Sequence, residues 1–387
     1  MNKNSYLKLL IVCLAVVLFS VSLTGTSYSF SDEPIQFGVT CTLTGNNALS
    51  GEYIQRGAIL AMEHLNANGG VLGREVKLVI EDEGDNQQTA INASQKVLSN
   101  ENLSGFIGGF TSSYGLAMIP FVNNAEVPFM ALGTSASIAA EKSEWTWQTR
   151  LIDSYSSTAL ADAAAGLLKF EKPAILYVNE SFGISSYESV VKELKEKYNV
   201  TPSISLAYNR GESQFSNMFT QILASDADGL IAFVTQPIDA ATIMSQTKAM
   251  NFSIPKLGSS GFAMAVARQA VKGDADGWYV VTDYSSDGTH AACIDFEKAY
   301  QERWGTAGDL GAVTAYDSIM LLAKAAEQAG SSEPAKINAE LAKIEDYKGA
   351  LSDMTTDMNC QCFAQWEVLV MNENEGQTCS VIDYIMK

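Results

Sequence analysis

Apolar residues follow two periods along this chain from residue 34 onward. Short continuous apolar runs, typical of strands buried on both faces of a sheet, occur at residues 35–40, 76–80, 105–110, 128–132, 174–178, 203–208, 230–234 and 278–282. Between these runs, apolar residues recur every three or four positions, most clearly over residues 54–65, 187–198 and 215–222. This second period predicts amphipathic helices that each bury one face.

The alternation of single strands and helices indicates the fold class. Parallel strands need a crossover connection, which a helix packed on the sheet supplies, so we predict an α/β fold of doubly wound parallel sheets. The pattern continues for about 250 residues, more than one core comfortably holds, and it restarts near residues 147–153 without a Pro- or Gly-rich linker. We therefore expect two α/β lobes joined by strand-like segments. Near the C-terminus, residues 372–376 separate two apolar runs and predict a hairpin turn.

The first 30 residues have the layout of a secretory signal peptide. Lys3 and Lys8 precede an apolar run at residues 9–23, and small residues follow at 24–27. The run is shorter than the ~20 residues that cross a bilayer core. We expect cleavage of residues 1–30 and export of the mature chain.

Composition and charge narrow the possible partners. With 47% hydrophobic and 18% charged residues, the chain has the composition of a globular protein. Its net charge of −19 becomes −21 once the two lysines of the signal peptide are removed, and an acidic surface without basic clusters repels nucleic acid. The two histidines, His64 and His290, are too few for a catalytic triad together with a histidine metal site. Since the G-x-S-x-G, Walker and strand-placed G-x-G-x-x-G motifs are also absent, we expect no enzyme activity and no cofactor.

Five cysteines follow the signal peptide: Cys41, Cys293, Cys360, Cys362 and Cys379. An oxidising compartment permits a disulfide, which we expect among the three near the C-terminus, with the connectivity left open. The C-x-C spacing has no nearby histidine or second cysteine pair, so it predicts no metal site.

Three polar loops follow predicted strands and carry the candidate chemistry. In open parallel sheets, ligands bind beyond the carboxyl ends of the strands, and a helix N-terminus there suits a carboxylate or small phosphate. The loops contain Thr111-Ser112-Ser113, Thr134-Ser135-Ala136-Ser137 and Ser259-Ser260. Each loop is also explained by helix capping or turn formation, but three of them on one edge, split between two lobes, favour a ligand held in a cleft. Five acidic residues are interpreted as solvated surface, because no spacing selects a pair of them: Asp82, Asp85, Asp153, Asp283 and Asp317.

Several segments resemble the leucine/isoleucine/valine-binding protein family. The resemblance is carried by residues 37–45, 65–73 with the pattern Asn-x-x-Gly-Gly-x-x-Gly, 81–82, 107–109, 147–150, 208–215 and 315–317. It implies a type I periplasmic-binding-protein fold and the role of substrate-binding component of a branched-chain-amino-acid-type ABC importer. The implied lobes are residues 31–149 plus 281–360 and residues 150–280 plus 361–387, with three crossings at a hinge.

The same resemblance implies a set of ligand-binding residues. The family's carboxylate-binding serine falls at Ser112, beside Ser113, and its second carboxylate loop falls at residues 134–137, either as Thr134/Ala136 or as Ser135/Ser137. Further positions fall at Ser50, Phe182, Thr235 and Ser260. Ser260 replaces the acidic residue that meets an amino acid's ammonium group. The expected solute is therefore an organic or aromatic acid, or an amino acid whose ammonium charge is met elsewhere.

We therefore predict a monomeric periplasmic solute-binding protein. It captures a small carboxylate-bearing molecule by hinge closure and delivers it to the membrane subunits of an ABC permease. Two alternatives stay open at this point. One is an extracytoplasmic ligand-sensing protein that acts with a signalling partner, and the other is an exported α/β hydrolase.

Overall fold

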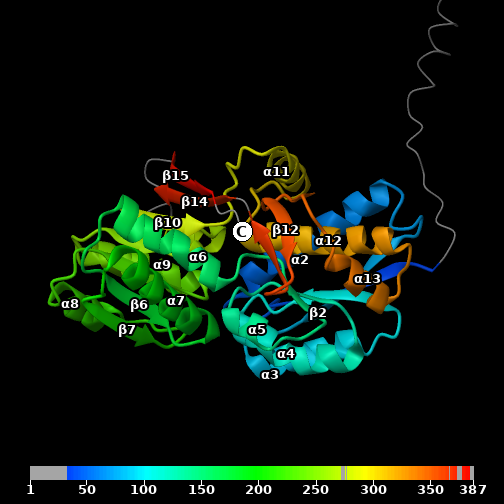
Figure 1. The fold of residues 1–387 in the computed structure, drawn as a ribbon, viewed down its shortest axis with the longest axis horizontal. Helices are drawn as coiled ribbons and strands as arrows, with labels where there is room; N and C mark the ends of the chain where they lie inside the picture. The colour runs from blue at the N-terminus through cyan, green and yellow to red at the C-terminus, as the bar shows by residue number, and fades with distance from the viewer. Residues whose placement is uncertain (1–32, 272–274, 276, 366, 373–376, 384–387) are drawn as a thin grey trace, which may run out of the picture.

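The structure is a computed structural model that describes residues 33–383 except 272–274, 276, 366 and 373–376. It forms two lobes, each built on one sheet with helices on both faces (Figure 1). The predicted signal peptide and the predicted turn at residues 373–376 lie outside the described residues. Among the helices that the structure describes, none combines the length and apolarity needed to cross a bilayer.

The first lobe contains an eight-stranded sheet. In spatial order its strands are β11 (Tyr347–Lys348), β12 (Asp353–Asp357), β13 (Cys362–Gln365), β5 (Thr146–Gln148), β4 (Phe129–Ala131), β3 (Leu103–Gly108), β1 (Ile35–Cys41) and β2 (Val76–Asp82). The strands from β13 to β2 are parallel, and β11, β12 and β13 pair antiparallel.

Helices cover both faces of this first sheet. One face packs against α2 (Ala48–Ala67), α12 (Leu310–Ala329) and α13 (Pro334–Leu341), with α11 (Ala291–Trp304) beside them. The other face packs against α3 (Gln87–Leu98), α4 (Ser112–Ala125) and α5 (Ala136–Ala140). Both faces of the central strands β1, β3, β4 and β5 are therefore buried, which is why β1 and β3 lie in largely apolar runs of the sequence, whereas the edge strand β2 and strand β12 are only partly buried.

The second lobe contains a seven-stranded sheet. In spatial order its strands are β15 (Gln377–Asp383), β14 (Glu367–Asn372), β10 (Trp278–Thr282), β9 (Lys256–Gly258), β8 (Leu230–Phe233), β6 (Ala174–Val178) and β7 (Ile204–Tyr208). Among the described strands of this sheet, β14 pairs antiparallel with both β10 and β15, as the predicted hairpin requires, and the remaining pairs are parallel. The helices on its two faces are α6 (Asp153–Ala161) and α7 (Ser181–Tyr198) on one, and α8 (Ser216–Leu223), α9 (Pro237–Ala249) and α10 (Ala265–Ala270) on the other.

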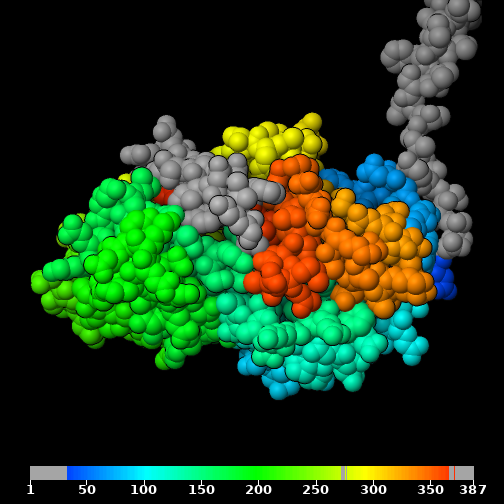
Figure 2. Space-filling view, in the orientation of Figure 1, coloured from blue at the N-terminus to red at the C-terminus, as the bar shows by residue number. Residues whose placement is uncertain are grey.

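The chain crosses between the sheets three times, after β5, after β10 and after β13. We expected residues 361–387 to belong together in the second lobe. Instead β13 pairs with β12 and β5 in the first sheet, so we place the third crossing after residue 365. On the face seen in Figure 2, the side chains of the two lobes touch where the green and cyan segments meet.

The expected C-terminal disulfide is not formed by Cys360 or Cys362. Both carry free thiols in the structure, as do Cys41 and Cys293 in the first lobe. The side chain of Cys379 lies outside the described part of the chain. The expected disulfide among the three C-terminal cysteines is therefore not formed by Cys360 and Cys362, the two whose side chains the structure describes.

Candidate ligand-binding site

Two glycine-containing loops bring the ends of β3 and β4 together. Gly109 has a φ of +62°, and a Cβ added there would lie 2.6 Å from the Cα of Gly115. A Cβ on Gly133 would lie 2.8 Å from the Cα of Ser112. Both loops therefore need glycine for close backbone approach. Their contact lets the backbone N–H of Ser135 donate to Ser112 Oγ at 3.2 Å.

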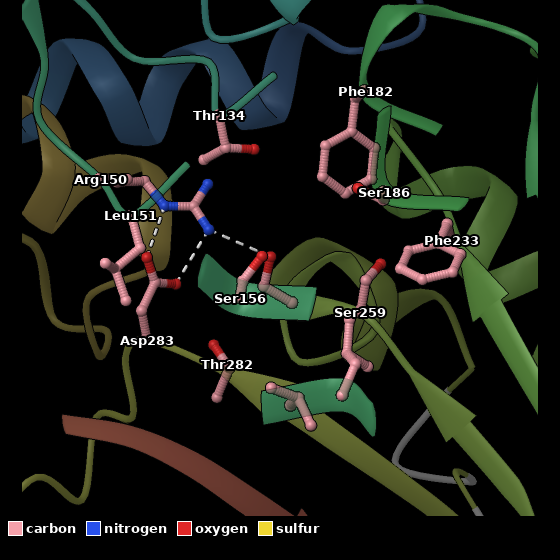
Figure 3. A pocket seen from close by; sticks show the side chains of 13 residues that line it. Thr134, Arg150, Leu151, Ser156, Phe182, Ser186, Phe233, Ser259, Thr282 and Asp283 are labelled. Atoms are coloured by element: carbon pink, nitrogen blue, oxygen red, sulfur yellow. Dashed lines mark hydrogen bonds and ion pairs between the residues drawn. The ribbon is translucent and has the colours of Figure 1, made fainter. Parts of the chain in front are cut away.

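A cavity of about 420 Å³, counted to its open mouth, lies beyond the carboxyl ends of β8, β9 and β10 (Figure 3). Its apolar wall comes from the second lobe and consists of Leu160, Phe182, Phe233 and Val281. Its polar wall includes Thr134 of the first lobe and Ser156, Ser186, Ser259 and Thr282 of the second. A neighbouring cavity of about 340 Å³ has Thr134, Arg150, Phe182 and Ser260 in common with it and reaches Ser112 and Thr235. The two cavities form one compartment between the lobes, at the strand edge where ligands bind in open α/β sheets.

A bidentate ion pair is part of the cavity wall. Arg150 follows β5 and Asp283 follows β10, so the pair lies at two of the three crossings. Arg150 Nε is 2.8 Å from Asp283 Oδ2, and Nη2 is 2.9 Å from Oδ1. Nη2 also donates to Ser260 Oγ at 3.1 Å. Figure 3 shows the remaining nitrogen, Nη1, on the side of Thr134, where it offers a charged donor to an anion.

Asp153, in the first turn of α6, is completely buried beside the cavity residue Thr134. Burial raises the pKa of its carboxyl to about 8, against the opposing effect of the Thr134, Ser185 and Ser186 hydroxyls and the Arg150 charge. These hydroxyls are near enough to act electrostatically, but no residue that the structure describes lies at hydrogen-bond geometry to either carboxylate oxygen. A protonated carboxyl at neutral pH is the consequence of this environment.

The two lobes hydrogen-bond across the compartment. Ser135 Oγ donates to the Ser181 carbonyl at 3.1 Å, and the N–H of Ala136 donates to Ser185 Oγ at 3.2 Å. Away from the cavity, the N–H of Ala265 donates to Asp309 Oδ2 at 2.6 Å. These contacts between residues of different lobes describe a closed arrangement.

Arg210 adds a charged contact between the lobes. It lies in the second lobe between β7 and α8, where it is ion-paired with Glu180. Its Nη1 donates to Tyr114 Oη of α4 at 2.8 Å, and its guanidinium carbon lies 5.2 Å from the Tyr114 ring centroid. Asp85 of the first lobe is 3.9 Å from the same guanidinium.

The structure separates the predicted site residues into two groups. Five of them line the compartment: Ser112, Thr134, Phe182, Thr235 and Ser260. The other five have different surroundings. Ser135 and Ala136 bond to the second lobe, and Ser137 is exposed with its N–H donating to Ser135 Oγ. Ser113 lies half-buried in the first turn of α4, and Ser50 is buried in α2 with no partner for its hydroxyl. Of the two possible registers, the structure thus places Thr134 at the cavity.

The interpretation of the strand-end acids as solvated surface was wrong for Asp153, Asp283 and Asp317. Asp153 and Asp317 are fully buried, and Asp283 is 8% exposed. Asp317 accepts the backbone N–H groups of Ala350 and Leu351. Sequence reasoning also missed Arg150 as a site residue. The available signal was a cation directly after a strand-like segment, in a chain with few basic residues.

Two doubly wound lobes that close on one compartment define a two-lobed solute-binding protein. The chain belongs to the periplasmic binding protein family, whose sequence model matches residues 34–366. This family is a class of binding proteins and not of enzymes. The family assignment excludes the hydrolase interpretation.

Curated relatives and solved structures agree with this assignment. Leu/Ile/Val-binding protein homolog 2 of Brucella abortus (strain 2308) is 24% identical, with 89% of this chain and 90% of that protein covered. A leucine-binding protein from Thermotoga maritima shares the fold at a TM-score of 0.82 and 21% identity, covering 90% of this chain and 99% of that one. A solute-binding protein from R. palustris in complex with benzoate has a TM-score of 0.81 at 19% identity, covering 90% and 96%.

Proposed function

We propose that this protein captures a small carboxylate-bearing solute in the periplasm and delivers it to an ABC permease. The observation that carries the proposal is the compartment between the lobes, where Arg150 Nη1 and the hydroxyls of Ser112 and Thr134 are potential donors to one anion. Charge-assisted hydrogen bonds of this kind are about twice as strong as neutral ones. The apolar wall would hold the rest of the solute.

The surroundings of Ser260 favour an acid without an ammonium group. Ser260 Oγ accepts from Arg150, and Asp283 uses both carboxylate oxygens on the same guanidinium. An ammonium placed beside Ser260 would face the Arg150 cation and find the Asp283 carboxylate already paired, a cost of several kcal/mol for an unpaired buried charge. We therefore place organic and aromatic acids before α-amino acids as solutes. A structural neighbour was solved with benzoate and another with isoleucine, which makes these two compounds suitable probes.

Binding of ligand-stripped protein to matched compounds tests this function. We propose titrating benzoate and 4-methylpentanoate against their amides and against leucine and isoleucine, by calorimetry and thermal shift. The acids are expected to raise the melting temperature, and the neutral amides are expected to bind at least about tenfold more weakly, the loss of one charge-assisted contact. Amides that bind as well as the acids would contradict an anion site. Binding of the amino acids alone would contradict the preference argued from Ser260.

Delivery to a permease is a separate claim with its own test. Deletion of the gene is expected to abolish high-affinity uptake of the identified solute by intact cells. Unchanged uptake together with loss of a solute-induced transcriptional response would instead favour a ligand-sensing protein. The same deletion strain complemented with the Arg150→Met variant should remain defective in uptake.

A further inference from the structure

A second cluster of chemically reactive side chains lies outside the solute compartment, at the turn between β12 and β13. Asp357 and Cys362 form the last residue pair of this antiparallel ladder. The turn returns through Gln361, whose φ of +44° is left-handed. The Gln361 carbonyl accepts the N–H of Gln148 at 2.9 Å, which anchors the turn to β5.

Three potential metal ligands converge at this turn. One carboxylate oxygen of Asp357 and the Sγ atoms of Cys360 and Cys362 all lie within 4.8 Å of one another. Cys362 is fully buried, whereas Asp357 and Cys360 are half-buried. The group is therefore held by backbone structure and still reachable from solvent.

A fourth polar group reaches the cluster from the other lobe. Tyr155 belongs to α6 of the second lobe, and its hydroxyl donates to Asp357 Oδ2 at 2.9 Å. The same hydroxyl is 3.6 Å from Cys360 Sγ. A hydrogen bond that orients a ligating carboxylate is the usual outer support of a metal site.

We propose that Asp357, Cys360 and Cys362 bind a zinc ion. Two thiolates are ligands that Zn²⁺ and Cu⁺ both accept, and the carboxylate oxygen in the set favours Zn²⁺ over the softer Cu⁺. Three protein ligands leave the fourth tetrahedral position for water. Binding releases the thiol protons, and the positive charge of the ion compensates the three anionic ligands that result.

The sequence signal for this site was incomplete. The C-x-C spacing was interpreted as no metal site because histidines and a second cysteine pair are missing nearby. A cysteine pair with one carboxylate at i−3, supported by a tyrosine about 200 residues away in the chain, is not a spacing that identifies a zinc motif. The ladder and the contact with α6 bring these four residues together.

Zinc binding to the reduced full-length protein tests the proposal directly. We expect one equivalent of Zn²⁺ by native mass spectrometry and calorimetry, and a thiolate-to-metal charge-transfer band when Co²⁺ replaces it. Cys360→Ser is expected to weaken binding by about tenfold or more, and Tyr155→Phe by about tenfold. Cys293→Ser is the matched control, because it removes a buried thiol from α11 in the first lobe. Circular dichroism and melting curves establish that each variant folds.

The proposal is overturned if the reduced protein binds no zinc. It is also overturned if Cys360→Ser binds zinc as tightly as the parent protein and the control Cys293→Ser do. A mass lower by two hydrogens before reduction, together with no zinc binding after reduction, would make the turn a disulfide instead. If the reduced parent protein binds zinc and Cys360→Ser does not, the site is supported, whether the protein was isolated with reduced or oxidised cysteines. The solute plays no part in any of these measurements.

Discussion

Arg150 and Asp283 are 133 residues apart in the chain, yet they form a bidentate ion pair at 2.8 and 2.9 Å in the wall of the compartment. Each belongs to a segment that connects the two sheets. The side chains are only 10% and 7% exposed, so water screens the pair little. The pair therefore contributes both to the stability of the hinge region and to the charge that a solute meets.

Removing one partner of this pair should cost more than removing both. Arg150→Met leaves the Asp283 carboxylate buried without compensation, which is expected to lower the free energy of unfolding by about 3 kcal/mol or more. The double variant Arg150→Met/Asp283→Leu should recover a large part of that loss, because no buried charge remains. Urea unfolding of the three proteins measures both effects, and equal stability of the single and double variants would contradict the argument.

Arg210 is expected to stabilise the closed arrangement in addition to pairing with Glu180 inside the second lobe. Its contacts with Tyr114 and Asp85 cross between lobes, so they are lost when the lobes separate. Arg210→Met should weaken solute binding by about 1 kcal/mol, close to fivefold, while a change in the melting temperature of solute-free protein reports the loss of the Glu180 pair.

Lys197→Met is the control for that experiment, since Lys197 pairs with Asp162 within the second lobe. Calorimetry at low and high salt should show a smaller salt dependence for Arg210→Met than for Lys197→Met. A loss of affinity of the same size in both variants would mean that the contact between lobes has no special role.

Asp153 should make stability depend on pH in a definite direction. Its pKa is about 8 in the folded protein and about 4 when the chain is unfolded. Between these values the folded state holds a proton that the unfolded state lacks, so stability falls as pH rises from about 4 to about 8. Burial raises the pKa of Glu83 and Asp317, each to about 7, which adds to the same trend.

The variant Asp153→Asn removes one titrating group from this trend. The difference between the unfolding free energies at pH 5 and pH 8 is expected to shrink by about 3–4 kcal/mol relative to the parent protein. Asp226→Asn, at an exposed position before β8, should leave that difference unchanged. Urea unfolding at the two pH values provides the comparison. If the unfolding free energy of Asp153→Asn changes between pH 5 and pH 8 as much as that of the parent protein, other groups cause the trend.

Two adjacent serines offer a matched pair for the anion site. Ser112 lines the compartment and Ser113 does not. If the Ser112 hydroxyl donates to a bound carboxylate, Ser112→Ala should reduce the affinity for the acid by about 1–3 kcal/mol, and Ser113→Ala should have little effect. Calorimetry with the acid that binds best tests this. Equal affinities of the two variants for the acid would mean that the Ser112 hydroxyl does not contact the solute and acts only within the protein, at the start of α4.

Much of the fold follows from the local pattern of the sequence. Strands were predicted at residues 174–178 and 278–282 with the bounds that the structure shows for β6 and β10, because strands buried on both faces must be continuously apolar. The strands β5 and β9 gave no distinct apolar run, since each has only three residues, and they were expected only as the strand-like segment near residue 147 and as the strand before Ser259. The sequence-based boundary for the third crossing, after residue 360, was five residues too early. The residues of a strand do not indicate which of two sheets the strand will pair with.

What the sequence determined by itself is the set of polar strand ends. Ser112 and Thr134 follow strands of the first sheet and Ser260 follows a strand of the second, and in each parallel sheet the carboxyl ends of the strands lie at the edge where ligands bind. The tertiary structure decided which other groups meet them there. Asp283 was interpreted as a solvated surface charge and Arg150 was given no role, yet two crossings bring them into contact. Asp357, Cys360, Cys362 and Tyr155 converge only where the two lobes touch. Hydrophobic periodicity is a local property that neighbouring residues carry together, whereas an ion pair or a ligand cluster depends on distances that only the packed chain sets.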